Sequence, residues 1–413
     1  MSGVVIIGAG HAGVGAAFEL RQLGFAGAIT VLDRSRHVPY ERPPISKSWV
    51  MDTVGPESLC ARGDGAFEAA SIELRLGVEV RTIDRSRRVV STSEGDVAYD
   101  KLILALGASP RQLPLPGREL EGVHALHTLE DALVLRESLR RAERLVVVGG
   151  GFIGLELASL AASFGLEVTV IETAHRLMAR ATSETTSAYM RARHEAAGVR
   201  IRTAVGVEGF AGSDGRLEGV LLADGTAVET PLALLGVGVV PNGSWLADVG
   251  LESDNGVIVD AELRTGDPHI FAIGDCARYP DDEGVRLRLE SVGNAADHAR
   301  RVAGILAGGT PAGMEIPWFW TKQVGVRLQM VGRIERVDEW LLAGSMDSGA
   351  FSVIGLRGGI LVYGESVNKP GDHVLLRKTL AAGPFTVDAR VRDLLGDGLK
   401  PAFQAAALAG VSR

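Results

Sequence analysis

The sequence predicts an α/β fold with two parallel-sheet βαβ domains and a smaller C-terminal α+β domain. Two observations lead to this fold class. The segments Val4 to Asp33 and Leu145 to Glu172 share one plan, which is an apolar strand, a glycine turn, a helix, a second apolar strand and an acid. From about Trp320 the pattern changes to short alternating strands followed by a helix, which is typical of a separate α+β domain.

The glycines of each turn have separate tasks in a Rossmann-like dinucleotide-binding unit. Gly8 makes the tight turn, Gly10 lets a pyrophosphate approach the backbone, and Gly13 lets the helix pack close to the strand. The second turn repeats the pattern at Gly149, Gly151 and Gly154. Helix N-termini bind phosphates, so the candidate cofactor-binding set also takes in the helix starts, His11, Ala12, Phe152 and Ile153. Glycine turns that serve packing alone are the alternative for either copy.

An acid follows the second strand of each βαβ segment. Asp33 and Glu172 are placed to accept hydrogen bonds from a ribose hydroxyl. Glu172 favours NADH over NADPH because it would repel a 2′-phosphate, a preference that Arg176 can soften.

Composition excludes several partners. The 413 residues suggest two to three domains, and a net charge of −8 gives no broad cationic surface for nucleic acid or anionic lipid. The sequence contains no apolar run long enough to predict a membrane span. Cys60 and Cys276 lie outside any zinc or dithiol motif, so we expect no metal site and a reducing, cytoplasmic setting.

Two strand-glycine-proline segments, Tyr99 to Gly117 and Leu232 to Asn242, look like crossings between domains. They predict a discontinuous first domain (1–109 and 240–319), an inserted domain (110–239) and a C-terminal domain (320–413). Gly238, in the second crossing, joins the cofactor-binding candidates.

These features resemble the two-dinucleotide flavoprotein reductases, whose fold is glutathione-reductase-like. The resemblance implies FAD in the first domain and a nicotinamide in the inserted one. A third element, "TGDPHIFAIGDCA", would place the Asp275 carboxylate at the flavin ribityl hydroxyls, with Gly274 permitting a close approach. For that motif alone, an Asp that caps the next helix is the alternative.

The segment "PYERPPISK" lacks the cysteines that disulfide reductases of this fold carry here, so the flavin passes electrons directly to an outside acceptor. It resembles the putidaredoxin-reductase-like ferredoxin reductases of bacterial cytochrome P450s and ring-hydroxylating dioxygenases. The resemblance implies that Arg42 contacts FAD and that Lys47 lies beside the isoalloxazine, where a cation stabilises charge on reduction. A solvated loop is the alternative for both residues.

The resemblance extends along the whole chain and implies further roles. Glu156, expected on the first turn of the second helix, would hold the nicotinamide end, although an acid that interacts with the helix dipole is the alternative. The candidate catalytic residues are therefore Lys47, Glu156 and Trp320. Further implied cofactor contacts are Val80, His127, where an Arg is usual, and Val292, at the start of a helix.

The segment "WTKQVG" departs from the Trp-Ser-Asp-Gln that is usual in this group. Trp318 and Trp320 are implied at the flavin and at the docking face, and Lys322 reverses a charge there. We expect a basic strip that steers an acidic two-iron ferredoxin, composed of Lys322, Arg327, Arg333 and Arg336. Scattered solvated charges are the alternative.

The expected reaction is hydride transfer from NADH to FAD, followed by single electrons to a two-iron ferredoxin that serves a cytochrome P450 or a Rieske-type oxygenase. One alternative is a stand-alone FAD and NADH oxidoreductase that acts on oxygen, a quinone or another small molecule. The other is a flavoprotein that senses NADH and controls a partner.

Overall fold

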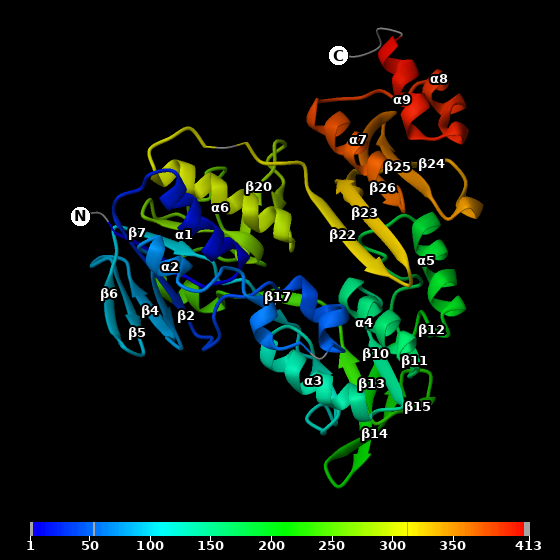
Figure 1. Cartoon of the computed structure of the whole chain (residues 1–413), viewed down its shortest axis with the longest axis horizontal. Coiled ribbons are helices and arrows are strands. Elements are labelled where there is room, and N and C mark those ends of the chain that lie inside the picture. Colours follow the sequence, from blue (N-terminus) through cyan, green and yellow to red (C-terminus); the bar gives the residue numbers. More distant parts are fainter. Residues whose placement is uncertain (1–2, 53, 312, 409–413) are drawn as a thin grey trace. The chain divides into compact units, whose positions relative to one another are not determined.

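The computed structural model describes residues 3–52, 54–311 and 313–408. Its internal contacts divide the chain into two compact units (Figure 1). Unit 1 comprises Met1–Arg42, Gly55–Ser109 and Val239–Glu315, and unit 2 comprises Pro43–Val54, Pro110–Gly238 and Ile316–Arg413. Within the described residues, no helix is both long and apolar enough to cross a membrane.

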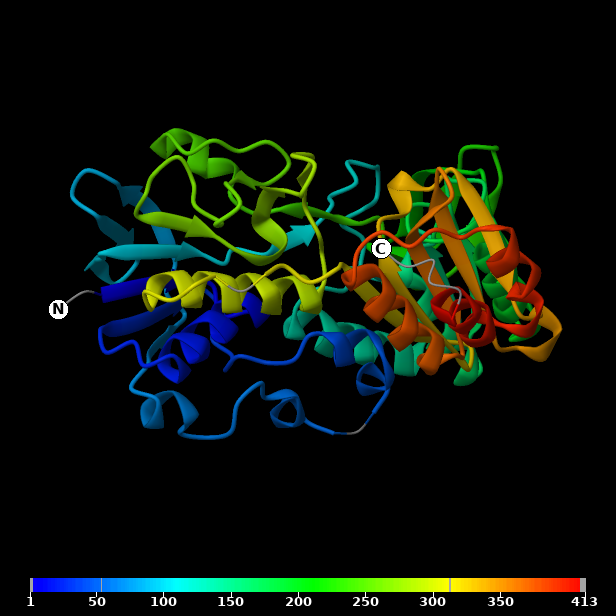
Figure 2. The ribbon, with the colours of Figure 1, turned by 90° about the horizontal axis from the view of Figure 1, so that it is seen from above.

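A five-stranded parallel sheet forms the centre of unit 1. Its strand order is β19 (Ile270–Ala272), β7 (Lys101–Leu104), β1 (Gly3–Ile7), β2 (Ala28–Asp33) and β3 (Glu73–Leu76). The central strands are continuous apolar runs because helices cover a parallel sheet. Helices α1 (His11–Gln22) and α6 (Val292–Leu306) lie side by side, and Gly15 allows their close contact at Ala299 (Figure 2).

Smaller elements complete unit 1. They are the short helix α2 (Ala66–Ala69), the antiparallel strands β4 (Val80–Asp84), β5 (Val89–Thr92) and β6 (Gly95–Ala98), the crossing strands β8 (Ala108–Pro110) and β17 (Val239–Pro241), and the sheet of β18 (Val257–Ile258), β20 (Ala277–Pro280) and β21 (Arg286–Leu287).

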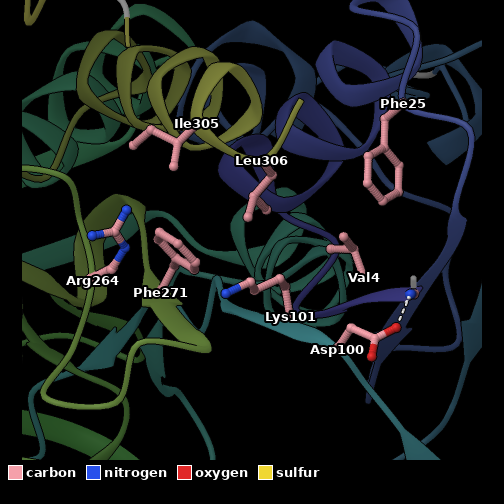
Figure 3. A pocket seen from close by; sticks show the side chains of 9 residues that line it. Val4, Phe25, Asp100, Lys101, Arg264, Phe271, Ile305 and Leu306 are labelled. Carbon is pink, nitrogen blue, oxygen red and sulfur yellow. Dashed lines mark hydrogen bonds between the residues drawn. The ribbon is translucent and has the colours of Figure 1, made fainter. Parts of the chain in front are cut away.

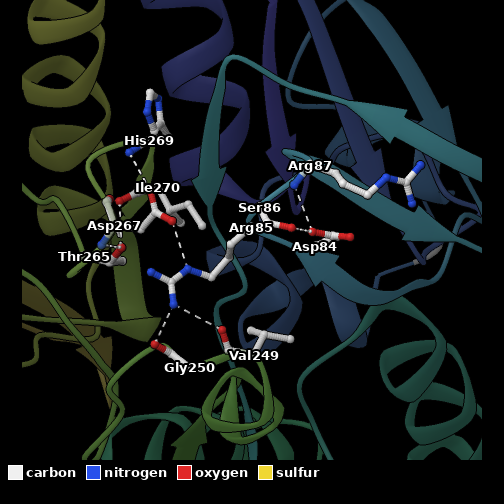
Figure 4. Close-up of polar contacts among 10 residues, drawn as sticks. All are labelled: Asp84, Arg85, Ser86, Arg87, Val249, Gly250, Thr265, Asp267, His269 and Ile270. Carbon is white, nitrogen blue, oxygen red and sulfur yellow. Dashed lines mark hydrogen bonds and ion pairs between the residues drawn. The ribbon is translucent and has the colours of Figure 1, made fainter.

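Arg85 joins three parts of unit 1 that are distant in sequence (Figure 4). It follows β4, pairs with Asp267 Oδ2 at 2.9 Å and donates to the Gly250 carbonyl at 2.9 Å. Asp267 also accepts from the backbone N–H of His269 at 2.9 Å, directly before β19. The β4–β6 sheet is thereby fastened to the segment that leads into β19 and the Asp275 turn.

Unit 2 contains a second five-stranded parallel sheet. Its order is β12 (Arg200–Arg202), β11 (Glu167–Ile171), β10 (Arg144–Val148), β16 (Ala233–Leu235) and β9 (Val123–Ala125). The associated helices are α3 (Leu129–Arg141), α4 (Phe152–Ser163) and α5 (Glu184–Ala196). An antiparallel layer of β13 (Val207–Ser213), β14 (Arg216–Leu222) and β15 (Ala227–Glu229) shares an apolar core with one face of this sheet.

An antiparallel sheet follows in the same unit, in the order β22 (Trp318–Gln323), β23 (Val326–Gly332), β26 (Ile360–Val367), β25 (Phe351–Arg357) and β24 (Glu339–Ala343). Helices α7 (Pro370–Ala381), α8 (Ala389–Asp393) and α9 (Leu399–Leu408) share one hydrophobic core with this sheet (Figure 1).

The segment 43–54 belongs with unit 2, whereas the division based on sequence places it in the first domain. Arg136 of α3 explains the attachment. It donates to the carbonyls of Trp49 and Val54 at 2.7 and 3.1 Å, and its guanidinium carbon lies 3.9 Å from the centre of the Trp49 ring. The three domain limits remain a prediction.

Candidate cofactor sites and active-site network

The first glycine turn has the geometry expected of a phosphate cradle. A Cβ at Gly8 would lie 2.2 Å from the Ala105 carbonyl oxygen, and one at Gly13 would lie 1.9 Å from the Gly8 oxygen. Gly8 also has a φ of 107°, which a side chain disfavours. A Cβ at Gly10, by contrast, would have no neighbouring atom within 4 Å. Its backbone is therefore open where a pyrophosphate would approach.

The second turn repeats this division. A Cβ at Gly149 would meet the Gly236 oxygen at 2.4 Å, and one at Gly154 would meet Val147 Cγ1 at 2.9 Å. Gly151 has only a contact at 4.0 Å, and it is the N-cap of α4, which begins at Phe152. The backbone of both turns therefore fits a dinucleotide, while each phosphate contact remains a prediction.

Asp33 and Glu172, the acids that end the two βαβ segments, accept hydrogen bonds in the same way, a feature that the sequence did not predict. Asp33 Oδ2 accepts the backbone N–H of Ala9 at 2.5 Å, and Glu172 Oε2 accepts that of Gly150 at 2.6 Å. In both cases the other oxygen accepts an N–H two residues further along, at 2.7 Å. Each carboxylate is thus fixed at the edge of its glycine turn with lone pairs left for ribose hydroxyls.

Arg176, which was expected to soften the preference for NADH, binds within its own loop, and the softening remains a prediction. Its guanidinium donates to the carbonyls of Thr182 and Ala179 at 2.7 and 2.8 Å. These bonds close the loop between β11 and α5 on itself, so the guanidinium is engaged within the loop.

Asp275 is the predicted acceptor for a flavin ribityl chain, and its carboxylate is largely buried. α6 is capped by Ser291, so Asp275 does not cap the next helix. No hydrogen bond reaches the Asp275 carboxylate from the described part of the chain. Burial, with the charge of Glu290, raises the pKa of Asp275 to about 6, against the opposing effect of Arg42 and Arg288. A carboxylate with unused acceptors fits a ligand rich in hydroxyls.

Two residues beside Asp275 were missed by the sequence analysis. Arg288 Nη1 donates to the Asp275 carbonyl at 3.2 Å, and its buried Nε has no partner among the described residues. His298 Nδ1 accepts the Gly274 N–H at 3.1 Å, and burial lowers the pKa of His298 to about 3, so the ring is neutral. The signal for His298 was its place six residues after Val292 on a helix following the Asp275 motif.

Glu156 is the centre of a buried hydrogen-bond network in unit 2. Only 6% of the residue is exposed. Oε2 accepts from Ser46 Oγ at 2.8 Å and pairs with Lys47 Nζ at 3.2 Å, while Oε1 accepts from Thr321 Oγ1 at 2.7 Å. Two predicted catalytic residues, Lys47 and Glu156, are therefore in direct contact.

Glu156 lies just beyond the first helical turn, in which it was expected. α4 begins at Phe152, so Glu156 lies in the second turn, and the first turn contains no acid. The helix dipole acts mainly within the first turn, so it does not account for this residue. The hydrogen bonds and ion pair from Ser46, Lys47 and Thr321 account for this buried acid instead.

Strand β22 presents different residues on its two faces. On one face the rings of Trp318 and Trp320 stack with centroids 5.3 Å apart, and Arg377 lies 4.7 Å above Trp318. On the other face Phe319 contacts Phe152 at 4.7 Å between ring centroids, next to the predicted phosphate turn. Trp320 therefore lies one residue from Thr321 but on the opposite face.

The predicted basic strip is narrower in the structure. Lys322 and Arg327 are exposed and directly opposite each other in the β22–β23 register. Arg333 is different, because it pairs with Glu335 and its side chain is only 11% exposed. It does not contribute to the strip as expected.

The structure gives the positions of four further residues that were predicted to contact a cofactor. Val80 packs half-buried against the core of unit 1, and Val292 begins α6 as expected. His127 directly precedes Thr128, the N-cap of α3. Gly238 has a φ of 92°, and its carbonyl accepts the Arg111 N–H at 2.9 Å. Their contacts with a cofactor remain predictions.

A pocket of about 270 Å³ opens at the amino ends of β1 and β7, away from the glycine turn (Figure 3). Lys101, Arg264 and Phe271 contribute to its wall, and none of the predicted site residues lines it. No group of three or more His, Cys, Asp or Glu that could hold a metal ion occurs within the described residues.

The sequence of this chain matches two known protein-family models. Residues 2–299 match the family model for pyridine nucleotide-disulphide oxidoreductases, and residues 318–397 match the model for the reductase C-terminal domain. The chain belongs to the ferredoxin reductases of this family. The family uses FAD and a pyridine nucleotide, and the predicted fold class is confirmed.

Individual relatives cover almost the whole chain. Rhodocoxin reductase of Rhodococcus erythropolis is 44% identical over 92% of this chain and 89% of its own. The ferredoxin reductase for the CYP199A2 system of Rhodopseudomonas palustris is 40% identical, with a TM-score of 0.93 over 97% of this chain and 100% of its own. The reductase in the covalent putidaredoxin reductase–putidaredoxin complex is 37% identical, with a TM-score of 0.94 over 100% and 99%.

Proposed function

We propose that this protein transfers electrons from NADH to a two-iron ferredoxin that serves a cytochrome P450 or a Rieske-type oxygenase. The observation that carries the proposal is the buried network at Glu156, in which two of the three donors come from a segment, 43–54, that contains no cysteine. Bound FAD would supply the step from a two-electron donor to a one-electron acceptor. The absence of a thiol in that segment leaves an outside acceptor as the destination. Cys60 and Cys276 are free, which supports a reducing, cytoplasmic setting.

Glu156 and Lys47 are the proposed contacts of the nicotinamide and the flavin. Glu156 already accepts from three side chains, so its carboxylate is fixed and acceptor-only, and it suits the amide N–H of a nicotinamide. Lys47 is 30% exposed in its side chain, so its ammonium keeps access beyond the pair with Glu156. A cation held in this way stabilises negative charge that builds up on a nearby ring.

Arg42 and Asp275 are the proposed contacts of FAD in unit 1. The charge of Arg42 acts on Asp275, where it opposes the raised pKa of the acid. The Asp275 carboxylate would accept from the ribityl hydroxyls, and the charge of Arg288 would partly compensate its own. The first glycine turn would receive the pyrophosphate at Gly10, whose backbone is open.

Glu172 supports NADH as the donor. Its carboxylate is held by the Gly150 N–H, and Arg176 is engaged elsewhere. A 2′-phosphate in this position would face a fixed negative charge. The proposed specificity is therefore for NADH.

The proposed docking face for the ferredoxin includes Trp318, Trp320 and Lys322. The stacked indoles are half-buried, and Lys322 and Arg327 add two adjacent positive charges on a chain with a net charge of −8. Such a local patch steers an acidic partner without attracting it to the rest of the surface.

A stepwise anaerobic experiment tests the proposal. NADH is added to the purified yellow protein, and a two-iron ferredoxin is then titrated in with cytochrome c as the final acceptor. We expect bleaching of the flavin by NADH and a cytochrome c rate that rises with ferredoxin and saturates. In a parallel assay in air, rapid NADH consumption that ferredoxin does not change would support the small-molecule oxidoreductase. A long-lived charge-transfer band with poor turnover would support the sensor.

A further inference from the structure

The network at Glu156 continues as a line of hydrogen bonds toward α5. Gln323 Nε2 lies 3.0 Å from Thr321 Oγ1, the same atom that lies 2.7 Å from Glu156 Oε1. His194 Nε2, on α5, lies 2.7 Å from Gln323 Oε1. Thr321 and His194 are 0% exposed and Gln323 is 2% exposed, so water does not compete for these bonds.

The orientation of the Gln323 side-chain amide determines which group donates in the hydrogen bonds at Thr321. An amide nitrogen only donates, so Thr321 Oγ1 accepts from it and gives its own proton to Glu156. The reversed amide would turn an oxygen toward Thr321 and draw the hydroxyl proton away from Glu156. In that case Glu156 loses a hydrogen-bond donor in a buried place.

His194 selects between the two orientations. Burial lowers the pKa of His194, so the ring is neutral and carries a single proton. No described residue bonds to its Nδ1. A proton on Nε2 therefore has an acceptor in Gln323, whereas a proton on Nδ1 would be a buried donor without one. The ring consequently donates from Nε2, and Gln323 turns its nitrogen toward Thr321.

We propose that Gln323 and His194 are positioning residues that keep Glu156 an oriented hydrogen-bond acceptor for the nicotinamide. The inference rests on the proposed function, since it assumes that Glu156 binds the nicotinamide. Neither residue contacts the nucleotide itself. Strand β22 would then influence NADH affinity through Thr321 and Gln323 on one face, while it carries Trp318 and Trp320 on the other.

The test measures the NAD⁺ affinity of the oxidised, flavin-loaded protein by calorimetry, together with KM and kcat for NADH. For His194→Leu and Gln323→Leu we expect about tenfold weaker NAD⁺ binding and a similar rise in KM, with kcat within about twofold of the parent. For His194→Gln, whose amide nitrogen donates from near the Nε2 position, we expect an affinity within about twofold of the parent. Gln112→Leu, which changes an exposed amide in unit 2, is the matched control.

Equal NAD⁺ affinity in the parent and both Leu variants would overturn the inference, as would an equal loss in His194→Gln and His194→Leu. Glu156→Gln separates this outcome from failure of the proposed function. Unchanged NAD⁺ affinity in Glu156→Gln removes Glu156 from the nucleotide site, whereas a loss there without a loss in the Leu variants refutes only the positioning role. Gln323→Leu answers the question alone where His194→Leu does not fold.

Discussion

Glu365 accepts hydrogen bonds from both the backbone N–H and the hydroxyl of Ser183, at 2.5 and 2.7 Å. The Thr186 hydroxyl donates to it as well. Ser183 is the N-cap of α5, and Glu365 lies on β26, so the antiparallel sheet holds the start of this helix. The loop closed by Arg176 ends at the same point, which links the C-terminal sheet to the loop after Glu172.

Replacing Glu365 with Ala is expected to destabilise the protein by about 3 kcal/mol or more, because buried donors at Ser183 and Thr186 lose their acceptor. Glu365→Gln keeps one acceptor oxygen and should lose less than half as much. Chemical unfolding followed by tryptophan fluorescence measures the difference. Equal stability of the parent and the Ala variant would contradict this account of the contact.

The same residue predicts a dependence of stability on pH. Burial raises the pKa of Glu365 above its ordinary value of 4.5. The folded protein therefore holds the proton to a higher pH than the unfolded chain does. Stability from this group is fully present below pH 4.5 and is lost as the pH rises through the folded pKa. Thermal melts of Glu365→Gln, which cannot titrate, should decline less steeply above pH 4.5 than those of the parent.

Glu172→Gln is expected to reduce the preference for NADH over NADPH by roughly tenfold or more, since it removes the charge that opposes a 2′-phosphate. The measurement is the ratio of kcat/KM for the two nucleotides. Glu167→Gln, which changes an exposed acid at the start of β11, the strand that Glu172 follows, is the control and should leave the ratio unchanged. A parent enzyme that turns over NADPH faster than NADH would refute the assignment.

Features that depend only on residues close together in the sequence could be predicted. Gly8, Gly10 and Gly13 lie within one turn, and the spacing alone reports which backbone positions must be close and which must be open. The start of α6 at Val292, which the family resemblance implied, also has a local cause, because Ser291 caps the helix.

Contacts between distant segments could not be predicted. Thr321 donates to Glu156 across 165 residues, and no local pattern reports such a pairing. The engagement of Arg176 and the ion pair of Arg333 with Glu335 have another cause. A guanidinium takes whichever acceptors the fold brings within reach, so its partner is a property of tertiary structure.

Asp275→Asn is expected to weaken FAD retention, because the neutral amide replaces an acceptor that binds hydroxyls through charge-assisted bonds. Flavin absorbance after gel filtration measures the loss, and Asp248→Asn, an exposed position in unit 1, is the control. Full retention of FAD by the Asn variant would remove Asp275 from the flavin site.

The pKa of Asp275 adds a prediction on binding. Burial raises it to about 6, against an ordinary value of 3.8, so the acid of the flavin-free protein ionises only as the pH passes through 6. Since the ionised form is the stronger acceptor, FAD affinity of the apoprotein should rise between about pH 5 and 7. Titrations of FAD across this range should show the rise in the parent and a flat profile in Asp275→Asn.

Lys322→Glu tests the docking face on which the choice of partner depends. The change replaces one of two adjacent positive charges, so an acidic ferredoxin should associate more slowly, and its KM should rise about fivefold or more at low salt. The effect should shrink as salt screens the charges, while the rate of flavin reduction by NADH stays the same. Lys400→Glu makes the same charge change at another exposed site and should alter neither value. A ferredoxin KM that rises equally with both variants, or with neither, would place the partner elsewhere, because only a local field at β22 and β23 distinguishes the two lysines.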